Sequence, residues 1–261
     1  MAKNSDYILN LLSSKKLYTE ETLPNNIDID ELVKFIGLDK DNKNWALHKT
    51  FKNNYKDLTT KTYTQYLNDG DYWCMRHTIL NNISIDKFRK DFIEKLNGSV
   101  FEEENGSYRL DNNDMPKRCM FEYEYIHSLI ACLYLKMVTS ENGNNMFVKI
   151  RNSYKLEPSW LLNERTFCQW VFITKPFKSD CGKYEQSIVL SLRDVQKDVD
   201  NTKAYYISVE YLKYDIGNEE LTWNMATCSD AGGNIPKFLQ KSGIDKAIVD
   251  DVPSFLKFMK Y

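Results

Sequence analysis

The sequence predicts an α+β fold in which a long C-terminal helix covers an antiparallel sheet. Three observations lead to this expectation: alternating segments fill the second half of the chain, short turn-forming links separate them, and a long amphipathic run follows the last one. Strands are expected at 146–155, 167–174, 184–193, 203–214 and 220–227. Consecutive strands with short links favour an antiparallel meander.

The last expected strand and the helix after it form the most regular part of this pattern. From Leu221 to Thr227, large residues alternate with polar or small ones, as in a strand with one buried face. A turn cluster with two glycines follows at 229–233. Apolar residues then recur every three or four positions to Met259, which predicts a helix that Ser242-Gly243 and Pro253 bend or interrupt.

The first seventy residues are expected to be helical. Helices are predicted at 5–16, 28–36 and 45–58, the second of them capped by an aspartate and ended by Gly37. The chain is therefore divided into an N-terminal helical extension, 1–70, and a main domain, 71–261. Two alternatives stay open for the extension: it packs on the main domain, or it forms a separate interaction module.

A mixed pattern joins the extension to the meander. Residues 72–80 alternate as in a strand, and 84–96 have helical spacing after the capping residue Ser84. The dipeptide Asn105-Gly106 predicts a hairpin turn. Residues 119–138 are apolar nearly all round at helical spacing, so we expect a buried helix there.

Composition excludes several classes of function. The chain has 261 residues, 42% of them hydrophobic, which is enough for a sizeable core. Lys and Arg number 35 against 37 Asp and Glu, for a net charge of −2, so no global basic field would hold a nucleic acid. Six scattered cysteines without a CxxC pair, and no signal peptide at the start, favour reduced thiols in a cytoplasmic protein. No run approaches the ~20 apolar residues of a transmembrane helix.

The C-terminal stretch Trp-Asn-Met-Ala-Thr-Cys-Ser-Asp-Ala-Gly-Gly-Asn-Ile-Pro, followed by Asp-Val-Pro-Ser-Phe-Leu, resembles the ending of START-like (StAR-related lipid-transfer) domains. It is most similar to a fungal branch of largely unassigned function. The resemblance extends through 72–76, 165–167 and 206–210, and covers about residues 72–261. It implies a helix-grip fold, in which a curved sheet holds a long C-terminal helix, and a cavity for a hydrophobic ligand.

Charged and aromatic residues inside the expected strands are the candidate ligand-binding residues. A buried charge is costly unless it is paired, so an Arg–Glu pair at the polar end of an apolar cavity could orient a headgroup or hydroxyl. Solvent-exposed or purely structural charges are the other interpretation, and most of the aromatics would serve an ordinary core. The candidates are Arg76, Arg165, Trp170, Phe172, Tyr206, Glu210, Trp223 and Phe238.

Two hypotheses for function follow. The first is a soluble lipid-binding or lipid-transfer protein that holds an apolar ligand between the sheet and the C-terminal helix, with transient membrane contact. The second is a non-catalytic interaction module on a filled START-like core, with a protein partner bound through residues 1–70. Neither a nucleophile–base set nor metal-ligand spacing is visible, so catalytic residues, metals and cofactors are not expected.

Overall fold

The computed structural model describes residues 4–38, 44–55, 57–67, 70–111, 113, 115–140, 143–155, 163–195, 204–232 and 237–261, without the side chains of 118–120, 237–240 and 242. Within these ranges, no helix is both long enough and apolar enough to cross a membrane. No disulfide involves Cys74, Cys132, Cys168, Cys181 or Cys228 in the described structure.

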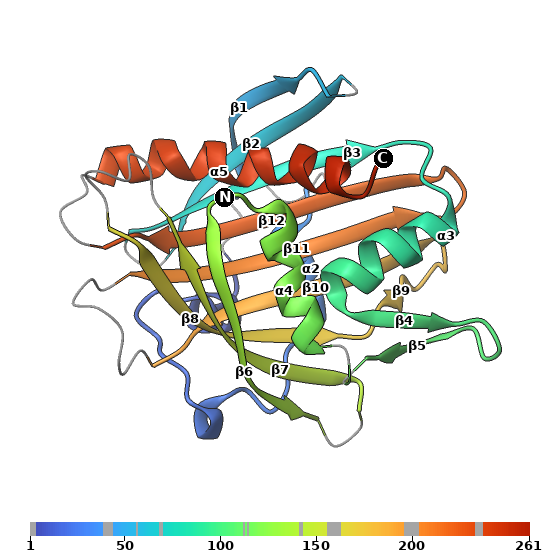
Figure 1. Cartoon of the computed structure of the whole chain (residues 1–261), viewed down its shortest axis with the longest axis horizontal. Helices are drawn as coiled ribbons and strands as arrows, with labels where there is room; N and C mark the ends of the chain where they lie inside the picture. Colours follow the sequence, from blue (N-terminus) through green and yellow to red (C-terminus); the bar gives the residue numbers. More distant parts are fainter. Residues whose placement is uncertain are drawn as a thin grey trace.

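A twisted antiparallel sheet of ten strands forms the centre of the molecule (Figure 1). Its order is β1-β2-β3-β12-β11-β10-β8-β7-β6, and the short β9 pairs with β10. The strands are β1 (Ala46–Asn53), β2 (Leu58–Leu67), β3 (Asp71–Leu80), β6 (Leu129–Thr139), β7 (Asn145–Tyr154), β8 (Arg165–Thr174), β9 (Phe177–Lys178), β10 (Tyr184–Arg193), β11 (Tyr205–Asp215) and β12 (Glu220–Asp230). β12 lies next to β3 because the chain returns to its first strands after the meander.

Helices cover one face of the sheet. They are α3 (Ile85–Lys87), the π-helical η2 (Phe88–Asn97), α4 (Met115–Tyr125) and α5 (Lys237–Phe258), and Figure 1 shows α5 in red, running along the strands. Between η2 and α4 the chain makes a small hairpin of β4 (Ser99–Glu102) and β5 (Ser107–Leu110). Phe92 of η2 and Phe255 of α5 pack against Trp223 of the sheet, with ring centroids 5.7 and 5.4 Å from its own.

The N-terminal segment covers the opposite face. It contains α1 (Asp6–Leu11), the short η1 (Glu20–Thr22) and α2 (Ile29–Ile36), and the caps are Ser5 for α1 and Asp28 for α2. The apolar residues of α1 and α2 join one core cluster with sheet residues such as Trp170, Ile188 and Leu190. The segment is therefore a structural layer of the fold.

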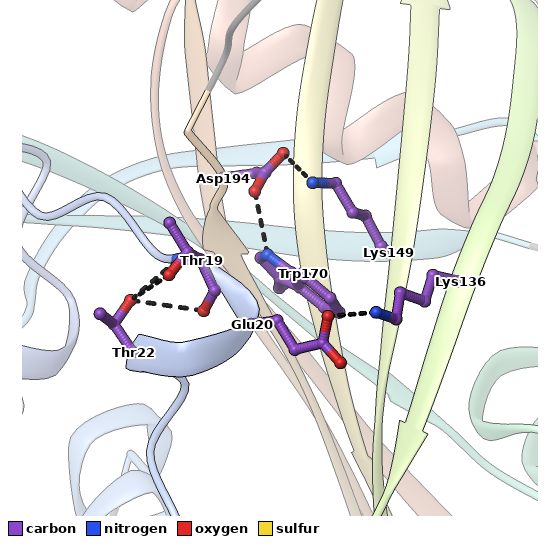
Figure 2. Close-up of polar contacts among 7 residues, drawn as sticks. All are labelled: Thr19, Glu20, Thr22, Lys136, Lys149, Trp170 and Asp194. Atoms are coloured by element: carbon purple, nitrogen blue, oxygen red, sulfur yellow. Dashed lines mark hydrogen bonds and ion pairs between the residues drawn. The ribbon is translucent and has the colours of Figure 1, made fainter.

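Polar contacts fix this layer to the strands (Figure 2). Asp194 accepts hydrogen bonds from Trp170 Nε1 at 2.9 Å and from Lys149 Nζ at 2.9 Å. The Tyr18 backbone pairs with the neighbouring residues Arg193 and Val195. Glu20 of η1 forms an ion pair with Lys136 of β6.

Much of the predicted architecture is confirmed. The five strands of the second half, the strand at 72–80, the hairpin at Asn105-Gly106 and the C-terminal helix are all present. Ser84 caps α3, and Asp28 and Gly37 bound α2, as expected. α5 continues through Gly243 and Pro253, so neither residue interrupts it.

Two predicted helices are wrong. Residues 119–138 split into the end of α4 and the strand β6, and 45–58 contain the edge strand β1. In 45–58 the apolar residues are four positions apart, and such residues share a face in a strand as well as in a helix. In 119–138 the segment is apolar nearly all round, and periodicity alone does not tell such a run in a helix from one in a strand. Pairing with β7 and with β2 decides for the strand.

These strands also change the picture of the first seventy residues. β1 and β2 belong to the main sheet, and β2 pairs with β3 across residue 70, with Leu67 opposite Asp71. The segment 1–70 is therefore helical only in its first half. The division of the chain at residue 70 stays a prediction.

Candidate functional site

A cavity of about 260 Å³ lies between the sheet and the helices α4 and α5. Its sheet wall comes from β3, β7, β8, β10, β11 and β12, and the two helices supply its roof. Most of the lining side chains are buried or half-buried, whereas Ser128 and Ala247 are exposed. The cavity therefore reaches the surface where the chain leaves α4 beside the middle of α5.

Strand alternation decides which side chains enter the cavity. On β11, Tyr206, Ser208 and Glu210 line it, while the residues between them, Ile207 and Val209, pack in the core cluster of the opposite face. Because successive side chains of a strand point to opposite faces, each strand contributes one set to the cavity and the other to the core. The cavity set is the more polar of the two.

An Arg–Glu pair lies in this wall. The register places Met225 of β12 opposite Arg76 on one side and opposite Glu210 on the other, so the two charged residues are two strands apart on the same face. The Arg76 guanidinium reaches over and donates to Glu210 Oε1 at 3.0 Å. Trp223 Nε1 donates to the same oxygen at 2.7 Å, and its ring lies 4.4 Å from the guanidinium carbon of Arg76.

Arg76 is the deeply buried member of this pair, and its hydrogen bonding is incomplete. Arg76 is only 2% exposed, and its Nε and Nη1 have no hydrogen-bond partner within the described structure. Asn152, also 2% exposed, lacks a partner for Oδ1. Buried polar groups in proteins are nearly always paired with protein or with water, so unpartnered atoms in the wall of a cavity indicate that something polar completes them.

A second acidic group enters the cavity from α5. Asp251 lines it, and burial raises the pKa of its carboxyl to about 7, with the nearby Arg76 opposing the shift and Glu210 and Glu122 adding to it. Burial also raises the pKa values of the Tyr154 and Tyr206 phenols, so both phenols are neutral at physiological pH.

The structure brings together four of the eight residues expected at the site: Arg76, Tyr206, Glu210 and Trp223 line the cavity. Trp170 and Phe172 lie on the opposite face, in the core under the N-terminal helices, because they alternate on β8 with Gln169 and Val171, which line the cavity. Phe238 belongs to α5, but its side chain lies outside the described part of the structure.

Arg165 has a different environment from the one expected. It lies at the start of β8 and is 5% exposed. Its Nε donates to the carbonyl oxygen of Ala231 at 2.6 Å, and its Nη1 donates to those of Asn163 and Glu164. Arg165 therefore joins the start of β8 to the segment after β12, and Arg76 is the partner of Glu210.

Sequence reasoning missed several lining residues, of which Asn152, Asp251 and Glu122 matter most here. Glu122 lies on α4, in a region whose helix was misplaced. Asp251 carried a visible signal, because it occupies the apolar stripe of α5, three positions after Ile248 and four before Phe255. A charge on an otherwise apolar helix face is unusual and indicates a specific environment.

One further polar cluster lies beside the cavity. Asp245 of α5 accepts from Lys49 Nζ at 2.8 Å, lies 3.0 Å from His48 Nε2, and accepts from Cys74 Sγ at 2.9 Å. Burial and the adjacent carboxylate raise the pKa of the Cys74 thiol, so it is not a nucleophile. Among the described residues, no group of three or more His, Cys, Asp or Glu side chains could hold a metal ion.

Solved structures with a START fold are similar to this chain. Human StAR-related lipid transfer protein 5 has a TM-score of 0.55 at 8% identity, over 89% of this chain and 92% of that one. Human STARD10 has a TM-score of 0.58 at 9% identity, over 96% and 85%. A fragment of a STAR-related lipid transfer protein from Xanthomonas axonopodis has 0.52 at 13%, over 84% and 100%.

These likenesses show the fold, since the identities are low. No curated protein matches the sequence at significant similarity. A family described as proteins of unknown function (DUF3074) matches residues 73–259, which include the sheet from Trp73 of β3 onward and the whole of α5. The chain therefore belongs to the DUF3074 family, and its fold is that of the START domains.

Proposed function

We propose that the protein binds a hydrophobic or amphiphilic small molecule, such as a lipid, in the cavity between the sheet and α5. The observation that carries this proposal is the coexistence of empty volume with buried polar atoms that lack partners, on Arg76 and Asn152. A ligand with an apolar body and one polar end would fill the volume and complete those atoms. Two of the structural neighbours are named as lipid transfer proteins, in agreement with this proposal.

The size of the cavity limits the ligand. At about 260 Å³, the cavity is slightly smaller than most small-molecule pockets, which span roughly 300–1,000 Å³. A single short chain or a small ring system fits this volume. A phospholipid with two long chains would need α5 or the strand ends to move apart.

Release of the ligand would require the roof to open. α5 contains Gly243, which is exposed, and an added Cβ there would meet no atom within 4 Å, so no close packing holds this position. We propose that α5 bends at Ser242-Gly243 to open the cavity, as glycines favour.

The alternative is a protein-interaction module on a filled core. It has less support, because the cavity is present and because the apolar residues of α1 and α2 are buried against the sheet, where a partner could not reach them. A partner could still use the exposed surface of the first seventy residues.

Native mass spectrometry of the purified protein, followed by organic extraction, tests the proposal. We expect a stoichiometric adduct of at most a few hundred daltons that added ligand displaces. A clean mass, unchanged after incubation with sterols, fatty acids and phospholipids, would favour the interaction module.

Two variants of buried or half-buried charged residues sharpen this test. Glu210→Gln removes the charge that pairs with Arg76 and should reduce ligand retention more than it lowers stability. Arg165→Ala is the control, because it removes another buried, hydrogen-bonded charge that does not line the cavity. It should lower stability and leave retention by the folded protein unchanged. Equal effects on both properties in the two variants would assign Glu210 a structural role only.

A further inference from the structure

Most of the described charged side chains that line the cavity are acidic. Among the described residues that line it, Arg76 is the only Lys or Arg, whereas Glu122, Glu210 and Asp251 are acidic. Arg76 already has partners, because its Nη2 donates a hydrogen bond to Glu210 and the Trp223 ring lies against its guanidinium. Glu210 therefore takes up the charge of Arg76, and no other described Lys or Arg lines the cavity to pair with Asp251.

Asp251 is the group that lacks compensation. No hydrogen bond or ion pair to its carboxylate is found within the described ranges, although Arg76 lies close enough to oppose its pKa shift. It projects from α5 into the cavity and keeps part of its surface accessible there. A carboxylate in such a place costs free energy unless a cation or a proton joins it.

The groups near Asp251 in the cavity suit a ligand that donates hydrogen bonds. The Asn152 side chain hydrogen-bonds the Tyr154 phenol, and Tyr154 lies close enough to Asp251 to sense its charge. The Oδ1 atom of Asn152 is an acceptor without a donor. Tyr154, Tyr206 and Phe167 surround this part of the cavity with aromatic rings, and such rings attract cations.

We infer that the cavity selects a protonated amine on a compact apolar body, with the ammonium at Asp251 and next to Asn152 and Tyr154. This inference rests on the proposed function and names the class of ligand for the same cavity. The two unpartnered N–H groups of Arg76 would then serve a hydroxyl of the ligand or a water molecule.

The pairing predicts a proton linkage. The groups that act on Asp251 are Arg76 from β3, Glu210 from β11, Glu122 from α4 and Asp250 from α5, together with the phenols of Tyr154 and Tyr206. Because the pKa of Asp251 is about 7 without a ligand, its carboxylate is mostly protonated at pH 6 and mostly ionised at pH 8. An ammonium binds the ionised form, so its affinity should rise about tenfold between these two values, in proportion to the ionised fraction.

Three probes of one shape test the inference: octylamine, octan-1-ol and octanoate, each short enough for the cavity. Isothermal titration calorimetry of the full chain at pH 8 should show octylamine binding at least tenfold more tightly than octan-1-ol, and octanoate binding most weakly. Asp251→Asn keeps the shape and removes the charge, so it should cost octylamine about tenfold and leave octan-1-ol unchanged. The octylamine affinity of the wild type should fall toward pH 6, with no change for octan-1-ol, and this measurement needs no variant.

The outcomes separate this inference from the proposed function. Equal affinities for octylamine and octan-1-ol, or octylamine binding that is insensitive to both pH and Asp251→Asn, would overturn the amine assignment while leaving an apolar ligand in place. Preference for octanoate would overturn it too, and would assign the free N–H groups of Arg76 as the polar anchor. Binding of none of the three probes would overturn both proposals.

Discussion

The two faces of the same sheet have opposite properties. On β10, Leu190 and its alternate neighbours Ile188 and Leu192 are at most 1% exposed and pack under α1 and α2. Val189 and Ser191, the residues between them, line the cavity on the other face. One face is a filled core, and the other carries a hollow with charges in it.

The difference shows that hydrophobicity identifies the packed face and not the ligand face. Large aromatic and branched residues are most stabilising where neighbours close around them, so Trp170 and Phe172 lie in the filled core. A filled core could not hold Glu210, Asp251 and Asn152 on one side without many compensating partners. Polar residues that alternate with apolar ones along a strand are therefore the better indicator of a ligand site in this fold.

The largest effect is expected on the filled face. Trp170→Ala should lower the free energy of unfolding by about 3–5 kcal/mol, because it leaves a void in the core and removes a hydrogen bond to Asp194. Urea unfolding of the full chain measures this change. The protein that remains folded should retain its ligand, because Trp170 does not line the cavity.

Trp170→Phe is the control, since it keeps most of the volume and removes the indole N–H. It should cost about 1–3 kcal/mol, the penalty of an unsatisfied hydrogen bond. Loss of ligand in either variant without a loss of stability would show that the two faces are coupled, contrary to the comparison.

A second effect concerns the charge on the cavity face. The pKa of Asp251 is about 7 in the folded protein and near 3.8 when unfolded, so the folded state binds more protons between these values. The contribution of Asp251 to stability therefore decreases as pH rises from about 4 to about 7 and is constant above. Asp251→Asn removes this dependence. The variant should gain on the order of 2 kcal/mol over the wild type between pH 5 and pH 7.

Thermal unfolding of both proteins at pH 5, 6, 7 and 8 measures this difference. Asp250→Asn, at an exposed neighbour on α5 that does not line the cavity, is the matched control. If the stability of the wild type instead rose relative to that of Asp251→Asn with increasing pH, the fold itself would stabilise the carboxylate, and its charge would need no ligand.

A third effect concerns the roof of the cavity. Asp245→Asn weakens the contacts of α5 with Lys49 on β1 and Cys74 on β3, so it should cost about 2 kcal/mol. Ligand dissociation should also become faster, because these contacts hold α5 against the sheet. Lys246→Gln, an exposed change next to it, is the control for both measurements. An unchanged dissociation rate in Asp245→Asn would exclude movement of α5 as the route of release.

Much of the fold could be predicted from the sequence, because alternation and turn residues are local signals. The meander, the hairpin and α5 follow from them. The strands β1 and β6 could not be predicted in this way. Apolar residues at i and i+4 in β1 suit a helix and a strand alike, and β6 belongs to a run that is apolar nearly all round, so only pairing with the neighbouring strand decides. The position of the N-terminal helices could not be predicted from local signals either, because they pack on a sheet face that segments distant in the sequence form together.

The site was half predictable for a related reason. Buried charges in strands pointed to Arg76 and Glu210, because such charges need partners wherever they lie. Trp170 and Phe172 were placed on the wrong side of β8, since the choice of face depends on what covers each side of the sheet. The charge of Asp251 within an apolar stripe was a usable signal, and its meaning depends on the cavity that it enters.

The smallest effect compares the two faces directly by the same substitution. Val209 on β11 is 0% exposed in the filled core, where it lies opposite Leu190 of β10. Val189, the residue before Leu190, lies opposite Glu210 and lines the cavity. Val209→Ala should cost about 2 kcal/mol, for two buried methyl groups and the void that they leave. Val189→Ala should cost about 1 kcal/mol less, because its side chain already borders empty space. Urea unfolding measures both, and ligand affinity should change only in Val189→Ala. Equal costs would mean that the cavity wall is packed as tightly as the core, and that the ligand site lies elsewhere.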